Sequence, residues 1–425
     1  MKTERASIPE VVSQLAEDCA SLFKQRENAV NCCTFPARFT DIERLDERVD
    51  AAVDALRTTD EEGWRAAVEG LDLQGGGEIF TAAVLAFEDG SAEPLTTSRI
   101  DVLLGALEKP GQALRPLVAA LEWIDRTRVP AVMARLATEP SPLARAVRIR
   151  SLAVLGSSGF AEVREALETG SKSVIAAACE AAVLMGERRL LPWVELHLEA
   201  DDVQIQVCAG MASVFLGSRR AIDVLRKIAT ETKGPLADLA ATILFRSREP
   251  GEALIMHEEL FRPDQPTRAA VLSAGATGIP ELVPFLIATL DCDTLSRLAA
   301  EGFCCITGAD VSVLSGEVPQ NARTGPTEDP ADENTDLDPD EGKRWPDRAK
   351  VERWWRENSQ PFQPMTKYLA GTVVNDASLR NKLKGAPQNL RACAAQLLAL
   401  GGLPLFDVRA PAFRQSQRLQ GGVWR

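Results

Sequence analysis

Side chains from which most active sites are built are scarce in this sequence. Its 425 residues include two histidines and one tyrosine, and only 5% are aromatic. No H-x-x-x-H, C-x-x-C, G-x-S-x-G or Walker pattern occurs. Because acid–base, nucleophilic and imidazole–metal sites depend on such residues, we predict a protein that is not an enzyme, with no catalytic residues, no cofactor and no metal ligands.

Long apolar runs are also missing. No stretch is apolar enough to cross a membrane, and the amphipathic start, with Glu10, Glu17 and Asp18, lacks the apolar region of a secretory signal. The nine cysteines are an odd number scattered over the chain, which argues against a disulfide framework. We therefore expect a cytoplasmic protein with reduced thiols and no membrane partner.

Acidic residues outnumber basic ones, and their distribution is uneven. A formal net charge of −13 opposes binding to polyanions, so we expect no nucleic-acid partner. Residues 1–90 carry −10, residues 309–342 carry −9 and residues 343–425 carry +10. The acidic segment can pair with the basic one, or compete with an outside partner for it. A solvated acidic segment without contacts is the equal alternative.

A repeat of about 30 residues organises the middle of the chain. Segments that end in apolar and small residues recur, and each closes on a glycine suited to the left-handed end of a helix. These glycines are Gly156, Gly186, Gly217, Gly278 and Gly308. Each unit holds two helical patterns that cannot bury their apolar faces alone. The sequence therefore predicts an all-α protein, an α-solenoid with six such units over residues 128–310.

The flanking segments are predicted to form atypical ends of this stack. Two helices are expected near the N-terminus, over residues 9–28 and then up to Leu56, with Asp41 as the N-cap of the second. Asp347 is expected to cap a later helix. The predicted domains are an N-terminal helical cap (1–74), degenerate helical repeats (75–127), the repeats (128–310), an acidic flexible loop (311–344) and a basic aromatic C-terminal module with a final repeat (345–425).

Part of the acidic loop has the spacing of a calcium loop. Asp336, Asp338 and Asp340 fall at its first, third and fifth positions, and Asp347 at its twelfth. The sixth position requires a glycine for a sharp turn but holds Glu341. A plain acidic linker is therefore favoured over a calcium site.

Two features are candidate partner-binding sites. Arg188 with Arg189, and Arg219 with Arg220, stand 31 residues apart and could bind an anionic partner surface. An inter-repeat ladder, in which each arginine pairs with a neighbouring Asp, is the favoured alternative. Trp354 and Trp355 combine aromatic area with basic charge, as interface hot spots do, although packing onto the repeats explains them slightly better.

Two resemblances follow from these patterns. Residues 202–225 resemble the HEAT-like repeat of the phycobilisome-lyase type, which implies the fold alone. The end segments resemble an uncharacterised proteobacterial family of HEAT-like repeat proteins commonly encoded near type VI secretion genes, with Phe413 standing where a Trp is expected. The segments are ERLDERVDA (43–51), GW (63–64), WPD (345–347) followed by Trp354 and Trp355, YLAG (368–371) and LFDVRAPAFRQ (405–415).

The family resemblance implies an accessory role without catalytic residues. We therefore expect a protein-binding scaffold or adaptor, accessory to type VI secretion, whose partner is a secreted effector or a spike component that it loads or neutralises. The alternatives are a HEAT-like base-repair enzyme that binds nucleic acid, which would need a basic concave face, and a bilin lyase-like protein. The near-neutral charge of the repeats argues against the first.

Overall fold

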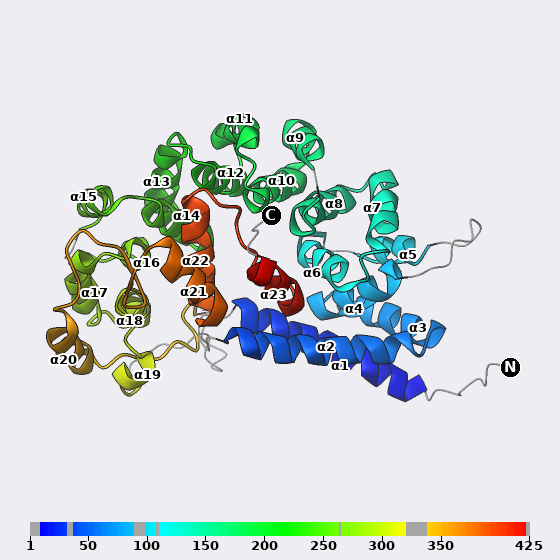
Figure 1. Ribbon diagram of the computed structural model, residues 1–425, viewed down its shortest axis with the longest axis horizontal. Helices are drawn as coiled ribbons and strands as arrows, with labels where there is room; N and C mark the ends of the chain where they lie inside the picture. Colours follow the sequence, from blue (N-terminus) through cyan, green and yellow to red (C-terminus); the bar gives the residue numbers. More distant parts are fainter. Residues whose placement is uncertain are drawn as a thin grey trace, which may run out of the picture. The chain divides into compact units, whose positions relative to one another are not determined.

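The structure, a computed structural model, describes residues 9–31, 37–88, 98–107, 110–157, 159–262, 265–319 and 338–421. It confirms an all-α fold of helical repeats, solenoid-like in its stacking (Figure 1). The chain divides into two compact units. Unit 1 comprises Met1–Cys32, Ala37–Val194 and Leu403–Arg425, and unit 2 comprises Cys33–Pro36 and Glu195–Gly402.

Unit 1 is a stack in which α4, α6, α8 and α10 each pack on the next, and α1 packs on both α2 and α4. Small side chains, such as Ala82, Ala119 and Ala178, are buried where these helices meet, so their backbones approach closely. The helices of the unit are α1 (Pro9–Asn31), α2 (Phe39–Arg57), α3 (Glu61–Gly70), α4 (Gly76–Phe87), α5 (Arg99–Gly105), α6 (Pro110–Trp123), α7 (Val129–Thr138), α8 (Pro142–Val154), α9 (Phe160–Thr169), α10 (Lys172–Met185), α11 (Leu191–Glu195, whose last residue belongs to unit 2) and α23 (Ala412–Gly421).

Unit 2 continues the same pattern with α12, α14, α16 and α18 in succession. Gly275 and Gly302 bring α16 and α18 into backbone contact, because a Cβ on Gly275 would lie 2.9 Å from the Gly302 Cα. The elements are α12 (Val203–Phe215), α13 (Ala221–Glu231), α14 (Pro235–Arg246), α15 (Pro250–Leu260), α16 (Arg268–Thr277), α17 (Val283–Thr289), α18 (Asp293–Thr307), α19 (Val311–Leu314), α20 (Arg348–Asn358), the antiparallel strands β1 (Tyr368–Leu369) and β2 (Thr372–Val373), α21 (Asp376–Gly385) and α22 (Gln388–Leu400).

The repeat pattern read from the sequence corresponds to these elements. Six successive helix pairs, from α7–α8 to α17–α18, fall between residues 128 and 310. The repeat glycines adopt the left-handed conformation expected of them. Their φ angles are +71° at Gly156, +61° at Gly186, +94° at Gly217, +72° at Gly278 and +75° at Gly308.

Two expectations about the ends need correction. Helix α2 begins at Phe39, so Asp41 lies in its first turn and its carboxylate accepts the Arg38 N–H at 2.8 Å instead of capping the helix from outside. Helices α3 and α23 were not expected. Residues 345–402 belong to unit 2 and residues 403–425 to unit 1, and the predicted domain bounds stay a prediction. Asp347 caps α20 as expected, accepting the Lys350 N–H.

The C-terminal part of the chain donates hydrogen bonds to the carboxyl ends of repeat helices. In unit 2 the Tyr368 N–H donates to the Gly278 carbonyl at 2.7 Å, after α16, and the Ala370 N–H to the Cys305 carbonyl at 2.6 Å, near the end of α18. The Lys367 ammonium donates to the last carbonyl of α14 at 3.0 Å. These carbonyls have no partner inside their helices, so the contacts satisfy groups that a helix end leaves open.

The same arrangement occurs within unit 1. The Leu405 N–H donates to the Val183 carbonyl of α10 at 3.1 Å, and the Arg414 guanidinium to the Glu122 carbonyl of α6 at 3.2 Å. Arg418 donates to the last carbonyl of α8. Cations at helix carboxyl ends are favoured by the helix dipole, which gives the basic C-terminal segment a structural use.

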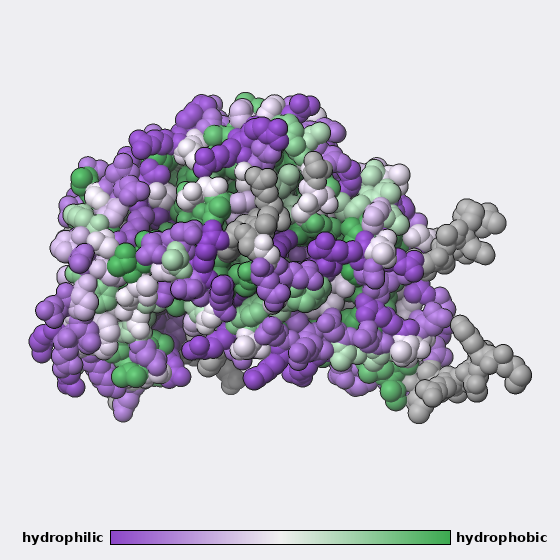
Figure 2. Space-filling view, viewed as in Figure 1, coloured by the Kyte–Doolittle hydropathy of each residue, from purple (hydrophilic) through white to green (hydrophobic). Residues whose placement is uncertain are grey.

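The face seen in Figure 2 is mostly hydrophilic, with hydrophobic residues in small separate groups. None of the helices that the structure describes has the length and apolar character needed to cross a membrane.

A pair of glycine substitutions tests the contact between β1 and α16. We expect Gly278→Ala to lower the free energy of unfolding by about 2 to 4 kcal/mol, because its Cβ would meet the Tyr368 carbonyl oxygen at 2.6 Å as well as strain the backbone. Gly217→Ala has the same left-handed backbone but open space around it, so it should cost only about 1 kcal/mol. Urea unfolding followed by circular dichroism measures both, and equal losses would contradict the role assigned to β1.

Candidate functional site

A buried ion cluster in unit 1 holds the tail, residues 403–421, against α1, α2 and α6. Arg26 of α1 is fully buried, and its guanidinium donates to the Asp46 carboxylate and to the Ala410 carbonyl, both at 2.9 Å. The other oxygen of Asp46 accepts the Ala412 N–H at 2.5 Å. One arginine and one carboxylate thus join two helices to the start of α23. A buried pair of this kind is costly to break, because each charge would be left without its partner.

Arg115 of α6 forms a second contact with the tail. Its guanidinium pairs with Glu27 at 3.1 Å and donates to the Arg409 carbonyl at 2.8 Å. Asp407, a residue of the tail, is buried, and its side-chain carboxylate lies 3.7 Å from the Arg150 guanidinium of α8. Burial alone would raise the pKa of Asp407, but Arg409, Arg150 and Arg115 outweigh it and hold the pKa well below its usual range. Asp407 therefore stays ionised as the counter-charge of these arginines.

Glu122 is a carboxylate of this cluster whose pKa is raised, as burial also raises the pKa of Asp46. It is 1% exposed and neither of its carboxylate oxygens accepts a hydrogen bond, with Arg115 3.7 Å away. Burial and the neighbouring charge of Asp407 raise the pKa of Glu122 to about 7, against the opposing effect of Arg115. Its protonation therefore changes near neutral pH.

An open hollow of about 580 Å³ lies beside this cluster. We call it the tail hollow. Three parts of unit 1 form it: the ends of α2 and α4, the segment that closes α6, and the first turn of α23. Its lining residues are Arg57, Glu88, Trp123, Ile124, Asp125, Arg126, Phe413 and Arg414.

The aromatic wall of the tail hollow is rigid. Trp123 is buried, donates its indole N–H to Asp50 and packs edge-on against Phe80 with ring centres 5.3 Å apart. The Arg26 guanidinium lies over its ring at 5.4 Å. Phe413, on the tail side, is 38% exposed. The lining of the hollow therefore combines the buried Trp123 with the partly exposed ring of Phe413.

The arginines of the tail hollow differ in their freedom. Arg57 is held by Glu88 through two hydrogen bonds of 2.7 and 2.6 Å. Arg126 is exposed and forms no ion pair within the described part of the chain. The Arg414 guanidinium lies over the Phe413 ring, 4.7 Å from the ring centre. Burial, followed by the charge of Arg126, lowers the pKa of Arg414. Two like charges that face one hollow can both bind a single carboxylate.

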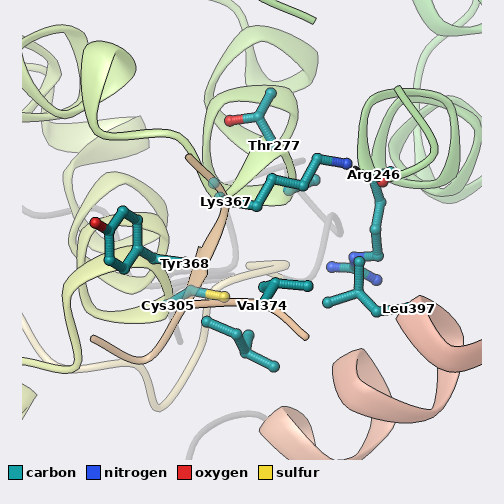
Figure 3. A pocket seen from close by; sticks show the side chains of 11 residues that line it. Arg246, Thr277, Cys305, Lys367, Tyr368, Val374 and Leu397 are labelled. Atoms are coloured by element: carbon teal, nitrogen blue, oxygen red, sulfur yellow. Dashed lines mark hydrogen bonds between the residues drawn. The ribbon is translucent and has the colours of Figure 1, made fainter. Parts of the chain in front are cut away.

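Unit 2 has a much smaller cavity, about 10 Å³, at the carboxyl ends of α14, α16 and α18 (Figure 3). Lys367, Cys305 and Arg246 line it together with Tyr368. A space of this size holds one water molecule and no larger ligand. Among the described residues, no group of three or more His, Cys, Asp and Glu side chains is arranged to hold a metal ion.

The arginine pairs singled out in the sequence are exposed, and one member of each pair forms an ion pair. Arg189 of unit 1 pairs with Glu187 at 2.7 Å and stacks on Phe160 at 4.6 Å. Arg220 of unit 2 pairs with Glu195 at 2.9 Å. Glu187 is two residues from Arg189, whereas Glu195 is 25 residues from Arg220 and lies in the preceding repeat. Neither partner is Asp202, which caps α12, or Asp223. Arg188 and Arg219 are also exposed. Their role in binding a partner stays a prediction.

The tryptophans of α20 pack on unit 2. Trp354 and Trp355 are partly buried and meet the Phe303 ring of α18 edge-on, with ring centres 5.6 and 6.2 Å apart. Trp345 is buried, and Arg297 lies over its ring at 4.5 Å. These contacts agree with the packing interpretation and leave part of the Trp354 and Trp355 surface exposed.

The described end of the acidic loop is fixed by arginines of the repeats. Asp340 is 1% exposed and accepts from Arg268 of α16 at 2.6 and 3.1 Å and from Lys343 at 2.8 Å. Arg297 of α18 donates to Asp338 at 2.6 Å. The acidic segment thus pairs here both with arginines of the repeats and with Lys343, the first residue of the basic segment 343–425. Residues 320–337, which include Asp336, lie outside the described residues.

Sequence reasoning missed the tail hollow. Phe413 and Arg414 were part of the segment that carried the family resemblance, but nothing in the sequence placed them beside Trp123 and Arg126. The available signal was an aromatic residue next to or near an arginine in each segment, Phe413 with Arg414 and Trp123 with Arg126. Comparisons of the chain with protein-family models, with curated proteins and with solved structures find no significant match.

The raised pKa of Glu122 predicts a pH-dependent stability. Because the folded-state pKa of about 7 exceeds the ordinary glutamate pKa of about 4.5, the folded state binds more protons between these values, and its stability falls as pH rises through them. Glu122→Gln should not show this loss. The free energy of unfolding of the variant, relative to that of wild type, should therefore be about 3 kcal/mol greater at pH 8 than at pH 4. Urea unfolding across this range measures it. Glu165→Gln, at an exposed position, is the control, and parallel curves for wild type and Glu122→Gln would contradict the assignment.

Asp340 should stabilise unit 2 without calcium. We expect Asp340→Asn to cost about 3 kcal/mol, because it leaves Arg268 and Lys343 without their buried counter-charge. Asp376→Asn, which removes an exposed pair with Arg380, should cost less than about 1 kcal/mol. Thermal unfolding with calcium or with a chelator should give the same midpoint for wild type, and a midpoint raised by calcium would restore the calcium-loop hypothesis.

Proposed function

We propose that this protein is a non-enzymatic scaffold or adaptor that binds a protein partner in the cytoplasm, accessory to type VI secretion through effector loading or neutralisation. The observation that carries the proposal of binding is the tail hollow. It presents an exposed ring, Phe413, and two arginines, Arg126 and Arg414, on elements that the buried ion cluster holds in place.

The residue types of the tail hollow support a protein partner. Aromatic and arginine side chains dominate the binding energy of protein interfaces when they stand on well-packed surroundings. Trp123 and the Arg26–Asp46 pair provide such surroundings beneath the exposed residues. A rigid site also loses less conformational entropy on binding than a flexible loop would.

The charges of the tail hollow select the partner's chemistry. Glu88 already neutralises Arg57, and the Asp125 carboxylate accepts from the Thr127 N–H and hydroxyl at 2.8 and 2.7 Å. Arg57, Arg126 and Arg414 outnumber Glu88 and Asp125 in the lining, so the hollow keeps an excess of positive charge for a carboxylate, although Arg414 also donates to the Glu122 carbonyl. The partner that fits is a protein segment with an acidic side chain next to an apolar one that covers Phe413.

The connection with type VI secretion is proposed from the family resemblance of the chain's end segments. One of these segments, residues 405–415, forms the tail that builds the hollow. The resemblance and the site thus involve the same residues, which supports treating the hollow as the place where a secretion component or toxin binds.

The test is a purification of the tagged protein from its host strain, with mass spectrometry of the proteins that accompany it. We expect a secretion spike component or effector with wild type, and roughly tenfold less of it with Arg126→Glu combined with Phe413→Ala, since hot-spot losses exceed about 1.4 kcal/mol. Both residues are exposed, so these changes should leave the helical content unchanged.

Arg188→Ala combined with Arg189→Ala is the matched control, because it removes exposed charge elsewhere in the same unit. If this variant, and not the hollow variant, loses the partner, the site belongs to the arginine pair. Recovery of no secretion component or toxin with wild type would refute the secretion role.

A further inference from the structure

The most exposed large apolar side chain that the structure describes is that of Leu73, at the end of the short 3₁₀ turn (Leu71–Leu73) between α3 and α4. It is 73% exposed, whereas Leu71 in the same turn is buried. Asp72 beside it and Glu69, three residues earlier, are exposed too, and neither forms an ion pair within the described part of the chain. We call Glu69, Asp72 and Leu73 the acidic knob.

The turn that carries the acidic knob is held from behind by Gln74. This residue has a φ angle of +51°, a left-handed conformation that residues other than glycine seldom adopt. Its side chain is buried, and the side-chain amide donates to the Leu71 carbonyl at 2.8 Å and to the Ala106 carbonyl, at the end of α5, at 2.9 Å. Leu73 is therefore kept outside the core on a fixed turn.

The acidic knob and the tail hollow lie at opposite ends of α4. The knob comes just before Gly76, where α4 begins, and Glu88, which lines the hollow, directly follows the last residue of α4. A helix of 12 residues is about 18 Å long. Both surfaces belong to unit 1, where α3, which leads into the knob, lies at the outer edge (Figure 1). The knob therefore cannot reach the hollow of its own chain, but a second chain can bring its knob there.

The acidic knob has the chemistry that the tail hollow selects. The hollow presents the partly exposed ring of Phe413 and an excess of positive charge that includes the exposed Arg126. Leu73 offers apolar surface to cover the ring, and Asp72, the adjacent residue, offers a carboxylate to the guanidinium. An apolar contact next to a charge-assisted hydrogen bond combines two of the strongest terms in protein interfaces.

We propose that the acidic knob of one chain docks in the tail hollow of a second copy. The proposal rests on the binding role proposed for the hollow, and not on the identity of the secreted partner. Knob and hollow are different surfaces, so each bound pair keeps one free knob and one free hollow and can add further copies. An interface built on one leucine is small, so the association is weak and reversible. Self-association and partner binding compete for the same hollow.

Sedimentation velocity of the full chain, over a series of concentrations and at low and high ionic strength, tests the contact. We expect the average mass of wild type to rise above that of one chain as concentration increases. The rise should be smaller at high ionic strength, because salt screens charges at the surface. Asp72→Lys combined with Leu73→Ser, the knob variant, should raise the dissociation constant by at least about tenfold. The hollow variant, Arg126→Glu with Phe413→Ala, should do the same.

The two variants can also be mixed. Each pair of a knob variant and a hollow variant holds one intact knob and one intact hollow, so an equimolar mixture should form 1:1 dimers that do not grow. Glu10→Lys combined with Val11→Ser is the matched control, because it changes another exposed acidic residue and its exposed apolar neighbour in unit 1. This control should associate as wild type does, and circular dichroism should show the same helical content for all variants.

Three results would overturn the proposal: a wild type that stays a single chain at every concentration, a knob variant that associates like wild type, and a mixture of folded variants without dimers. None of them contradicts the proposed function, because the knob variant keeps its hollow and should still recover the partner from the host strain. Conversely, self-association without any secretion component in that purification would refute the secretion role and leave the docking of the knob intact.

Discussion

The carboxyl ends of the repeat helices need hydrogen-bond donors, and the rest of the structure depends on how the chain supplies them. A helix leaves its last carbonyls without partners, and a stack of helices gathers many such groups at one edge. Backbone N–H groups of Tyr368, Ala370 and Leu405, and the charged side chains of Lys367 and Arg414, donate to them in the two units. The last part of the chain therefore completes the repeats instead of forming a domain of its own.

The positive charge of the C-terminal segment and the buried ion cluster have the same structural reason. Arginines that approach helix carboxyl ends are stabilised there but must be balanced where they are buried. Asp46 and Asp407 balance Arg26 and Arg150. Glu122 is the group left without hydrogen bonds in this arrangement, and its raised pKa is the consequence. The tail hollow lies beside this buried ion cluster, at the surface where Arg126 is exposed to solvent.

The repeats could be predicted because their signals are local. A glycine every 30 residues or so fixes each helix end, and the apolar pattern fixes each face. The tail hollow could not, because Arg414 and Glu122 are 292 residues apart in sequence and no local pattern joins them. Helix α23 was missed for a related reason: its buried Gln415 donates to the Val408 and Ala410 carbonyls, so a polar residue occupies a position where the pattern expects an apolar one. Asp41 was misplaced because the acidic residue serves the helix start from inside its first turn.

The hydrogen bond between Arg26 and the Ala410 carbonyl joins residues 384 positions apart, which sets a condition on how unit 1 is made. A ribosome adding about 5 to 20 residues per second needs roughly 20 to 80 s to cover that distance. During this time Arg26 of α1 and Arg115 of α6 lack the tail carbonyls of Ala410 and Arg409, to which their guanidinium groups donate in the finished protein. The first half of the protein to be synthesised is therefore among the last to be completed, and its folding is tied to the emergence of residues 407–412 rather than to its own length.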